Sequence, residues 1–388
     1  MVRGGTLQSL NLQGAGVRAL LGGQPLWTFF PGQQLDQPEV LDGPLYSVLM
    51  IAMGLGADLR LAGPVSETAL RNAREYQEAW TTLAPGWMRQ VEIIPDHVVE
   101  ARKPPTGRAV SAFSGGLDAT FTAIRHARRL LGEASYGLSH ALLVHGLDIR
   151  LEKAEVFAGL RRRVQPLIDE LGLELLVART NIVFPNPSRP ELQPQLFYLC
   201  QAPTIAGILH ALSGRFDHGL IASSEPYSRM VLPISSNPAT DHLLSGEQLQ
   251  VVHDGAGFLR SQKAELLAQV PAALKALRVC FETQQDGGNC GLCEKCVRTR
   301  INLMLGGAAD PPCFDQPFHI DMIDAVFPTE QVFLSEWRNI EAYALRKGVE
   351  TPWMDRIRAR LAQAPAPSGN PTYIDIGTRQ AFNRRNSR

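Results

Sequence analysis

The sequence of 388 residues predicts an α/β protein with a parallel central sheet. Short apolar runs alternate with helical stretches such as 119–131 and 156–171, the runs being residues 109–113, 141–145, 173–178 and 219–222. This alternation is typical of right-handed βαβ units whose sheet is covered by helices on both faces. Because ligands of such sheets bind at the carboxyl ends of the strands, we expect the loops after these runs to form the site.

Residues 1–105 predict a small accessory α/β region in front of this sheet. The apolar run 45–57 is shorter than the ~20 residues that cross a bilayer, so it indicates a buried helix rather than a membrane span. It is followed by predicted strands at 57–63 and 91–95, with a helix between them that runs from an N-cap at Ser66 to about Trp80. The Pro- and Gly-containing segment 102–107 predicts a linker.

The main domain is expected to span residues 106–310, with helices at 261–274 and 297–306. Further helices are predicted within 318–362, in a helical C-terminal region that spans residues 311–363. The Pro-containing and Arg-rich end, residues 364–388, predicts a flexible tail.

Charge and composition exclude several classes of protein. Lys and Arg number 38, as do Asp and Glu, so no net positive charge draws in a polyanion and a nucleic-acid partner is not expected. No secretion signal precedes the first region, which predicts a cytoplasmic location. No membrane association is expected.

Residues 109–120 combine a strand, a glycine turn and a helix start. Gly115 and Gly116 let the backbone approach a phosphate closely, while Ser114 and Thr120 offer hydroxyl groups. The segment therefore predicts an anion site, although an ordinary strand-to-helix turn is the simpler interpretation.

The helix of this segment opens with Leu117 and Asp118. Its free N–H groups add donors for an anion. Asp118 would repel a bare phosphate, so we expect it to hold Mg²⁺ on a pyrophosphate group. In the simpler interpretation it only favours the first helical turn.

Four of the six cysteines lie close together in the chain, at Cys280, Cys290, Cys293 and Cys296. Thiolates at this spacing, with Gly291 and the 287–288 glycine pair to turn the chain, predict a closed structural Zn²⁺ site. An iron–sulfur cluster uses the same ligands and stays an alternative.

Other polar residues follow the predicted strands. His145 and Asp148 come after the second strand and Glu225 after the fourth, so we expect contacts to a substrate or nucleotide. The alternative is a histidine satisfied by the backbone and an aspartate that caps a helix. Arg298 and Arg300 are expected on a solvated helix face, the alternative being contact with the nucleotide or an acidic partner. The His and Asp residues within 240–242 and 253–255 could indicate a metal site or a relay, but Asn237-Pro238 and Asp254-Gly255 are more simply interpreted as turns.

Together these motifs resemble the PP-loop (N-type) ATP pyrophosphatases, and in particular the QueC-like 7-cyano-7-deazaguanine synthases. The resemblance covers residues 108–305 and rests on S-G-G-x-D at 114–118, on Lys263-Ala-Glu265 and on C-x9-C-x2-C-x2-C at 280–296. The chain is also similar to the QueC-like components of antiphage operons, such as QatC and the type IV CBASS member. One departure is Ala119, which stands where the family usually has serine.

The resemblance implies a Rossmann-like fold of the adenine nucleotide alpha hydrolase type. It places ATP and Mg²⁺ on the 114–118 loop, makes Lys263 a phosphate contact and gives Zn²⁺ to the cysteines. It implies an ATP-dependent carbon–nitrogen ligase that adenylates a carboxylate, 7-carboxy-7-deazaguanine in the family, with release of PPi. The intermediate then passes to ammonia or an amine.

The amine source can be narrowed from the residues. No cysteine precedes Cys200, so a glutaminase nucleophile is not expected, and the nitrogen comes from ammonia, a small amine or a partner protein. Two alternatives stay open. One is a sulfur-transfer enzyme acting on tRNA, and the other is a degenerate scaffold or nucleotide-sensing subunit.

Overall fold

The computed structural model describes residues 5–10, 26–35, 38–182, 194–230, 232–280, 287–329 and 331–365. The expected tail at 364–388 lies outside the described residues from residue 366 onward. Among the described residues, no helix has the length and apolar character needed to cross a membrane.

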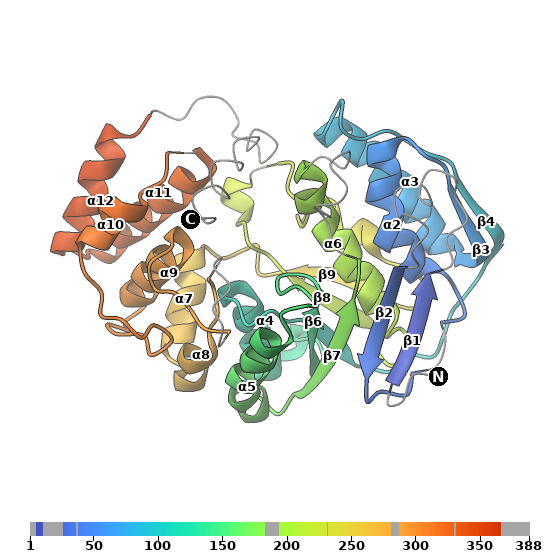
Figure 1. The fold of residues 1–388 in the computed structure, drawn as a ribbon, viewed down its shortest axis with the longest axis horizontal. Helices are drawn as coiled ribbons and strands as arrows, with labels where there is room; N and C mark the ends of the chain where they lie inside the picture. The colour runs from blue at the N-terminus through green and yellow to red at the C-terminus, as the bar shows by residue number, and fades with distance from the viewer. Residues whose placement is uncertain are drawn as a thin grey trace.

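A mostly parallel sheet forms the centre of the molecule (Figure 1). Its seven strands are ordered β1-β2-β7-β6-β5-β8-β9. The five parallel strands are β5 (Ala109–Ala112), β6 (Leu138–His145), β7 (Glu174–Thr180), β8 (His218–Ala222) and β9 (Gln250–Asp254). The parallel sheet expected from the sequence is therefore confirmed.

Helices cover both faces of the sheet. Successive strand residues point to opposite faces, so neighbours on one strand pack against different helices. On β6, Leu142 packs in one apolar cluster with α2 (Asp42–Leu55) and α6 (Pro194–His210). Its neighbours Ala141 and Leu143 pack in a second cluster with α4 (Leu117–Ala127) and α5 (Ala154–Glu170).

The N-terminal elements lie at one end of the molecule (Figure 1). An antiparallel hairpin of β1 (Gly5–Leu10) and β2 (Leu26–Pro31) extends the central sheet beyond β7. The strands β3 (Leu59–Ser66) and β4 (Ile93–Val99) form a separate parallel pair beside α3 (Glu67–Leu83). Ser66 caps α3, accepting the N–H of Ala69 at 3.1 Å as the sequence predicts.

The C-terminal helices lie at the other end of the molecule (Figure 1). These are α9 (Glu294–Leu305), α10 (Asp321–Val326), α11 (Gln331–Lys347) and α12 (Pro352–Gln363). They share a third apolar cluster around Trp337 and Ile301, which are both fully buried.

Two elements differ from the expectation. The helix predicted at 261–274 is two helices, α7 (Arg260–Ala268) and α8 (Pro271–Ala276), because Pro271 supplies no N–H to continue the first. Asp254, interpreted with Gly255 as a turn, ends the strand β9, and the turn follows at Gly255, whose φ is +91°.

Candidate functional site

The glycine turn between β5 and α4 has the geometry of an anion loop. Gly115 has φ +73°, a conformation that favours glycine, and a Cβ there would meet Val164 Cγ1 at 3.1 Å, so that side chain would have to shift slightly. Gly116 caps α4 without a side-chain acceptor, and its N–H donates to Ser114 Oγ at 3.2 Å. The N-terminus of α4 therefore opens toward the carboxyl end of β5.

A cavity lies at this edge of the sheet. It has two parts, of about 320 and 360 Å³, which share Ser114, Gly116, Asp118, Asp148 and several cations. The part that we call the apolar arm is lined by aliphatic side chains, among them Leu142, Val144, Ile182, Ile205 and Ile221. The part that we call the polar arm is lined by Glu225, Ser235, Ser236, Arg298 and Glu336.

Asp118 lines both parts of the cavity and pairs with two cations. Its Oδ2 accepts a hydrogen bond from Arg260 Nη1 at 2.6 Å, and its Oδ1 accepts one from Lys263 Nζ at 3.1 Å. Burial raises the pKa of Asp118, but Arg260 and Lys263 outweigh this and keep that pKa below its usual value. The carboxylate is therefore ionised.

Two further cations, Arg278 and Lys295, line both parts of the cavity. Arg278 is 7% exposed, and Arg260 Nε and Arg278 Nε are buried donors that lack a hydrogen-bond partner among the described residues. Burial, followed by the charge of Arg260, lowers the pKa of Lys295 to about 8. Unsatisfied donors and closely placed positive charges are what an anionic ligand would stabilise.

Arg260, Arg278 and Lys295 were not among the site residues predicted from the sequence. Signals were present, because Arg260 precedes Lys263 by one helical turn and Lys295 lies between two of the clustered cysteines. Lys263 itself is 1% exposed and lies behind Asp118, where its Nζ also donates to the Ser223 carbonyl. It supports Asp118 rather than lining the described cavity.

The other predicted residues separate into two groups. Leu117, Asp148 and Ala119 line the apolar arm, so the position where the family has serine faces the cavity. Thr120 is fully buried and is not part of the cavity lining that the structure describes, so its hydroxyl does not replace that serine.

His145 lies apart from the described cavity lining. Its Nε2 is 2.9 Å from the Arg150 carbonyl oxygen, and its ring stacks on Phe157 with centroids 4.3 Å apart. Burial lowers its pKa. This arrangement corresponds to the alternative of a histidine satisfied by the backbone.

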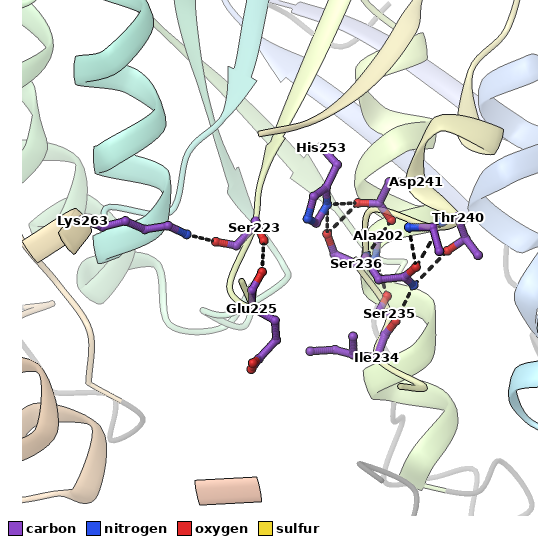
Figure 2. A network of polar contacts seen from close by, with 12 residues as sticks. Ala202, Ser223, Glu225, Ile234, Ser235, Ser236, Thr240, Asp241, His253 and Lys263 are labelled. Carbon is purple, nitrogen blue, oxygen red and sulfur yellow. Dashed lines mark hydrogen bonds and ion pairs between the residues drawn. The ribbon is translucent and has the colours of Figure 1, made fainter. Parts of the chain in front are cut away.

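Glu225 lies at one wall of the polar arm, in the turn after β8 (Figure 2). Ser223 Oγ donates to the Glu225 carbonyl at 2.6 Å, while the Ser223 carbonyl accepts from Lys263. The turn that carries Glu225 is thereby joined to Asp118 through one lysine.

The opposite wall is the segment 234–236 (Figure 2). Ser236 Oγ donates to Asp241 Oδ2 at 2.7 Å, and that same oxygen lies 2.8 Å from His253 Nδ1. Ser235 Oγ donates to the Leu199 carbonyl at 2.9 Å and accepts the Ala202 N–H at 2.7 Å. These bonds fix the wall against β9 and α6.

The four clustered cysteines converge on one point. Their sulfur atoms all lie within 4.8 Å of one another, with Cys280 Sγ to Cys293 Sγ and Cys290 Sγ to Cys296 Sγ both 3.9 Å. Sulfurs bound at about 2.3 Å to one tetrahedral Zn²⁺ lie about 3.8 Å apart. The N–H of Cys293 also donates to Cys290 Sγ at 3.3 Å. This cluster can hold a metal ion such as zinc.

The prediction that Arg298 and Arg300 lie on a solvated helix face is wrong, because the two residues are only 5% and 1% exposed. Arg298 donates to Glu294 Oε1 and Glu336 Oε2, each at 2.7 Å, and so joins α9 to α11. Arg300 donates to the Gln316 carbonyl and lies over the Phe314 ring at 4.8 Å. The packed C-terminal region, which local sequence does not reveal, buries this face.

The fold and site define an α/β protein with a mostly parallel sheet, a cation-lined cavity at the carboxyl edge and a cysteine cluster suited to a metal. Comparisons with protein-family models, with curated proteins and with solved structures found no match.

Proposed function

We propose that the protein is an ATP pyrophosphatase of the PP-loop type, with a Rossmann-like domain that binds ATP in the cavity. The supporting observation is the cluster of Arg260, Arg278 and Lys295 around the glycine loop. Unsatisfied guanidinium donors beside a helix N-terminus fit a polyphosphate. The chain as a whole has a formal net charge of +0, so this concentration of positive charge is specific to the cavity and does not reflect the composition of the protein.

In this proposal the N–H groups of the loop and the three cations bind the phosphates of ATP. Asp118 is the carboxylate suited to Mg²⁺, which supplies charge neutralisation on the leaving pyrophosphate when bound. Each Asp118 oxygen accepts one hydrogen bond from a cation, which leaves lone pairs for Mg²⁺, and in this proposal Arg260 turns toward the phosphates when Mg²⁺ binds. Ala119 leaves the loop without the serine hydroxyl of the family.

We propose carboxylate activation as the reaction. A substrate carboxylate attacks the α-phosphate, PPi leaves, and ammonia or an amine displaces AMP. The apolar arm is suited to a flat heterocycle such as 7-carboxy-7-deazaguanine, and the polar arm extends toward α11, where an amine from a small molecule or a partner protein can enter. A role in antiphage defence and a cytoplasmic location belong to the same proposal.

We propose that Cys280, Cys290, Cys293 and Cys296 bind one structural Zn²⁺. The support is the mutual spacing of the four sulfurs, which leaves no open ligand position. Elemental analysis of purified protein separates this from an iron–sulfur cluster, which would contain iron and labile sulfide and favour the sulfur-transfer alternative.

Asp118→Asn tests the reaction. Asparagine removes the charge but keeps the shape and one acceptor oxygen for Lys263, which is 1% exposed, whereas alanine would leave that ammonium group without any acceptor at position 118. We expect AMP and PPi formation to fall by about a hundredfold or more, measured with ATP, Mg²⁺ and 7-carboxy-7-deazaguanine.

Asp169→Asn is the matched control, because Asp169 is an exposed aspartate of the same domain. Ala119→Ser should keep or raise turnover by restoring a hydroxyl at the cavity. Release of ADP and phosphate, rather than AMP and PPi, would contradict the proposal. Wild-type protein without turnover on any candidate acid would favour the scaffold alternative.

A further inference from the structure

The segment that leads into the cysteine cluster is hydrogen-bonded to the glycine loop. We call residues 277–280 and 287–296 the cysteine module. The Arg278 N–H donates to the Gly115 carbonyl at 2.8 Å, so the segment that ends in Cys280 contacts the loop backbone at Arg278. The Arg278 side chain lines both arms of the cavity. A shift of Cys280 would therefore displace a cation of the anion site.

The second half of the module carries another cavity cation. Lys295 lies between Cys293 and Cys296 in the first turn of α9 and lines both arms. The arrangement of these cysteines thus sets where α9 begins and where Lys295 lies. Of the three cations that line both arms of the described cavity, Arg260, Arg278 and Lys295, the last two belong to the cysteine module.

Asn289 joins the two halves of the module. Its Oδ1 accepts the N–H groups of Val279 and Cys280 at 2.8 and 3.1 Å, and its Nδ2 donates to the Leu277 and Cys313 carbonyls at 2.9 and 3.0 Å. Asn289 is buried, is not one of the four cysteines that could bind the metal, and does not line the cavity that the structure describes. It is a positioning residue for the segment that contains Arg278.

We propose that metal binding by the four cysteines positions Arg278 and Lys295 to bind a polyphosphate, so that the metal and the anion bind cooperatively. The inference deepens the proposed function and rests on it only in taking a polyphosphate as the ligand. The four sulfurs lie within 4.8 Å of one another, and as thiolates they would repel one another unless a cation lay between them. Without it the module separates, and both side chains lose their place at the cavity.

Cooperativity of this kind is reciprocal. A metal that orders the module reduces the conformational cost of anion binding, and a bound anion that pairs with Arg278 and Lys295 slows opening of the module. The same arrangement makes the cysteine cluster more than a support for the fold, because loss of metal would weaken the ligand site even where the sheet persists.

Inorganic pyrophosphate and a non-hydrolysable ATP analogue are suitable probes for calorimetric titration of zinc-loaded and chelator-treated protein. We expect chelation to weaken pyrophosphate binding by about ten- to a hundredfold, while far-UV circular dichroism shows that the helices remain. In the reverse direction, pyrophosphate should slow zinc extraction by a chromogenic chelator.

Two variants test the argument in zinc-loaded protein. Arg278→Ala should weaken pyrophosphate binding to a similar degree with zinc content unchanged. Asn289→Ala should both hasten zinc extraction and weaken pyrophosphate binding, whereas a purely structural bond would affect zinc alone. Lys275→Ala removes an exposed cation of α8 and is the matched control, with neither property changed.

Equal pyrophosphate affinity of the folded protein with and without metal would overturn the inference. If chelation unfolds the chain, two other results would overturn the inference. One is that saturating pyrophosphate leaves the rate of zinc extraction unchanged, and the other is that Arg278→Ala binds pyrophosphate as tightly as the wild type. Zinc-dependent binding of pyrophosphate without binding of the ATP analogue would contradict the proposed function and leave the inference standing.

Discussion

Single carboxylates organise the loops around the sheet, and Asp217 is the clearest case outside the cavity. It precedes β8 and accepts hydrogen bonds from Lys103 Nζ at 2.8 Å and from the N–H groups of Thr106 and Gly107 at 2.8 and 2.7 Å. The predicted linker at 102–107 is therefore hydrogen-bonded to the residue that precedes β8, at the amino end of that strand. Burial raises the pKa of Asp217, but Lys103 and the two N–H donors outweigh it, and the pKa lies below its usual value.

Asp217→Asn should destabilise the protein at pH 7 by about 1–3 kcal/mol, because bonds to a charged acceptor are replaced by weaker ones. A lowered folded-state pKa contributes stability that is present above the unfolded value of about 4 and lost as pH falls through the folded value. The difference from wild type, measured by urea unfolding, should thus shrink below about pH 4. The exposed Asp315→Asn is the control, and a difference constant with pH would contradict this account.

At the scale of elements, one buried ion network joins α9 to α11. Arg298 lies between Glu294 and Glu336, which are 9% and 8% exposed, and Trp337 Nε1 donates to Glu294 Oε1 at 3.0 Å. Because α9 also carries Cys296 and Lys295, this network orients the helix that serves both the cysteine module and the cavity. The C-terminal helices thereby contribute to the site from outside the sheet.

Arg298→Ala should cost about 3–5 kcal/mol of stability, since it leaves two buried carboxylates without their cation. A fall in melting temperature, together with faster proteolysis of the C-terminal helices, would report the loss. The surface pair Arg358 with Glu350 offers the comparison, and Arg358→Ala should leave both readings unchanged. If both variants lowered the stability by the same small amount, the buried network would not be what holds α9 against α11.

For the whole molecule, the contact of α2 with α6 connects the N-terminal elements to the sheet. A Cβ at Gly207 would meet Ser47 Oγ at 2.0 Å and the Gly43 carbonyl oxygen at 2.6 Å, so the helices approach through glycine. The largest apolar cluster runs across this contact, from Leu49 of α2 to Val110 and Leu142 of the sheet. One continuous core thus includes the helix that the sequence places at 45–57.

Gly207→Ala should therefore destabilise the protein by about 1–3 kcal/mol or more, because the added methyl group forces the two helices apart. Thermal unfolding of the full chain would measure it. Gly214→Ala is the matched control, since a Cβ there meets nothing within 4 Å and we expect no loss. If Gly207→Ala were neutral, the close approach of α2 and α6 would not contribute to stability.

The sequence by itself determined the parallel sheet, the glycine loop and the cysteine cluster. Each depends on local signals, namely apolar periodicity, adjacent glycines and the spacing of thiols. The sequence also indicated the α2 and α3 helices and the Ser66 cap.

Only the tertiary structure decided which cations reach the cavity and which polar residues are buried away from it. Arg260, Arg278 and Lys295 come from three separate segments, and the chain folds them to one sheet edge. His145 ends β6 and Thr120 lies in the first turn of α4, positions from which a side chain could reach a ligand, yet packing turns both into the interior. Side-chain direction depends on neighbours distant in sequence, so local pattern predicted the elements and the loop, while long-range packing selected the residues that line the cavity.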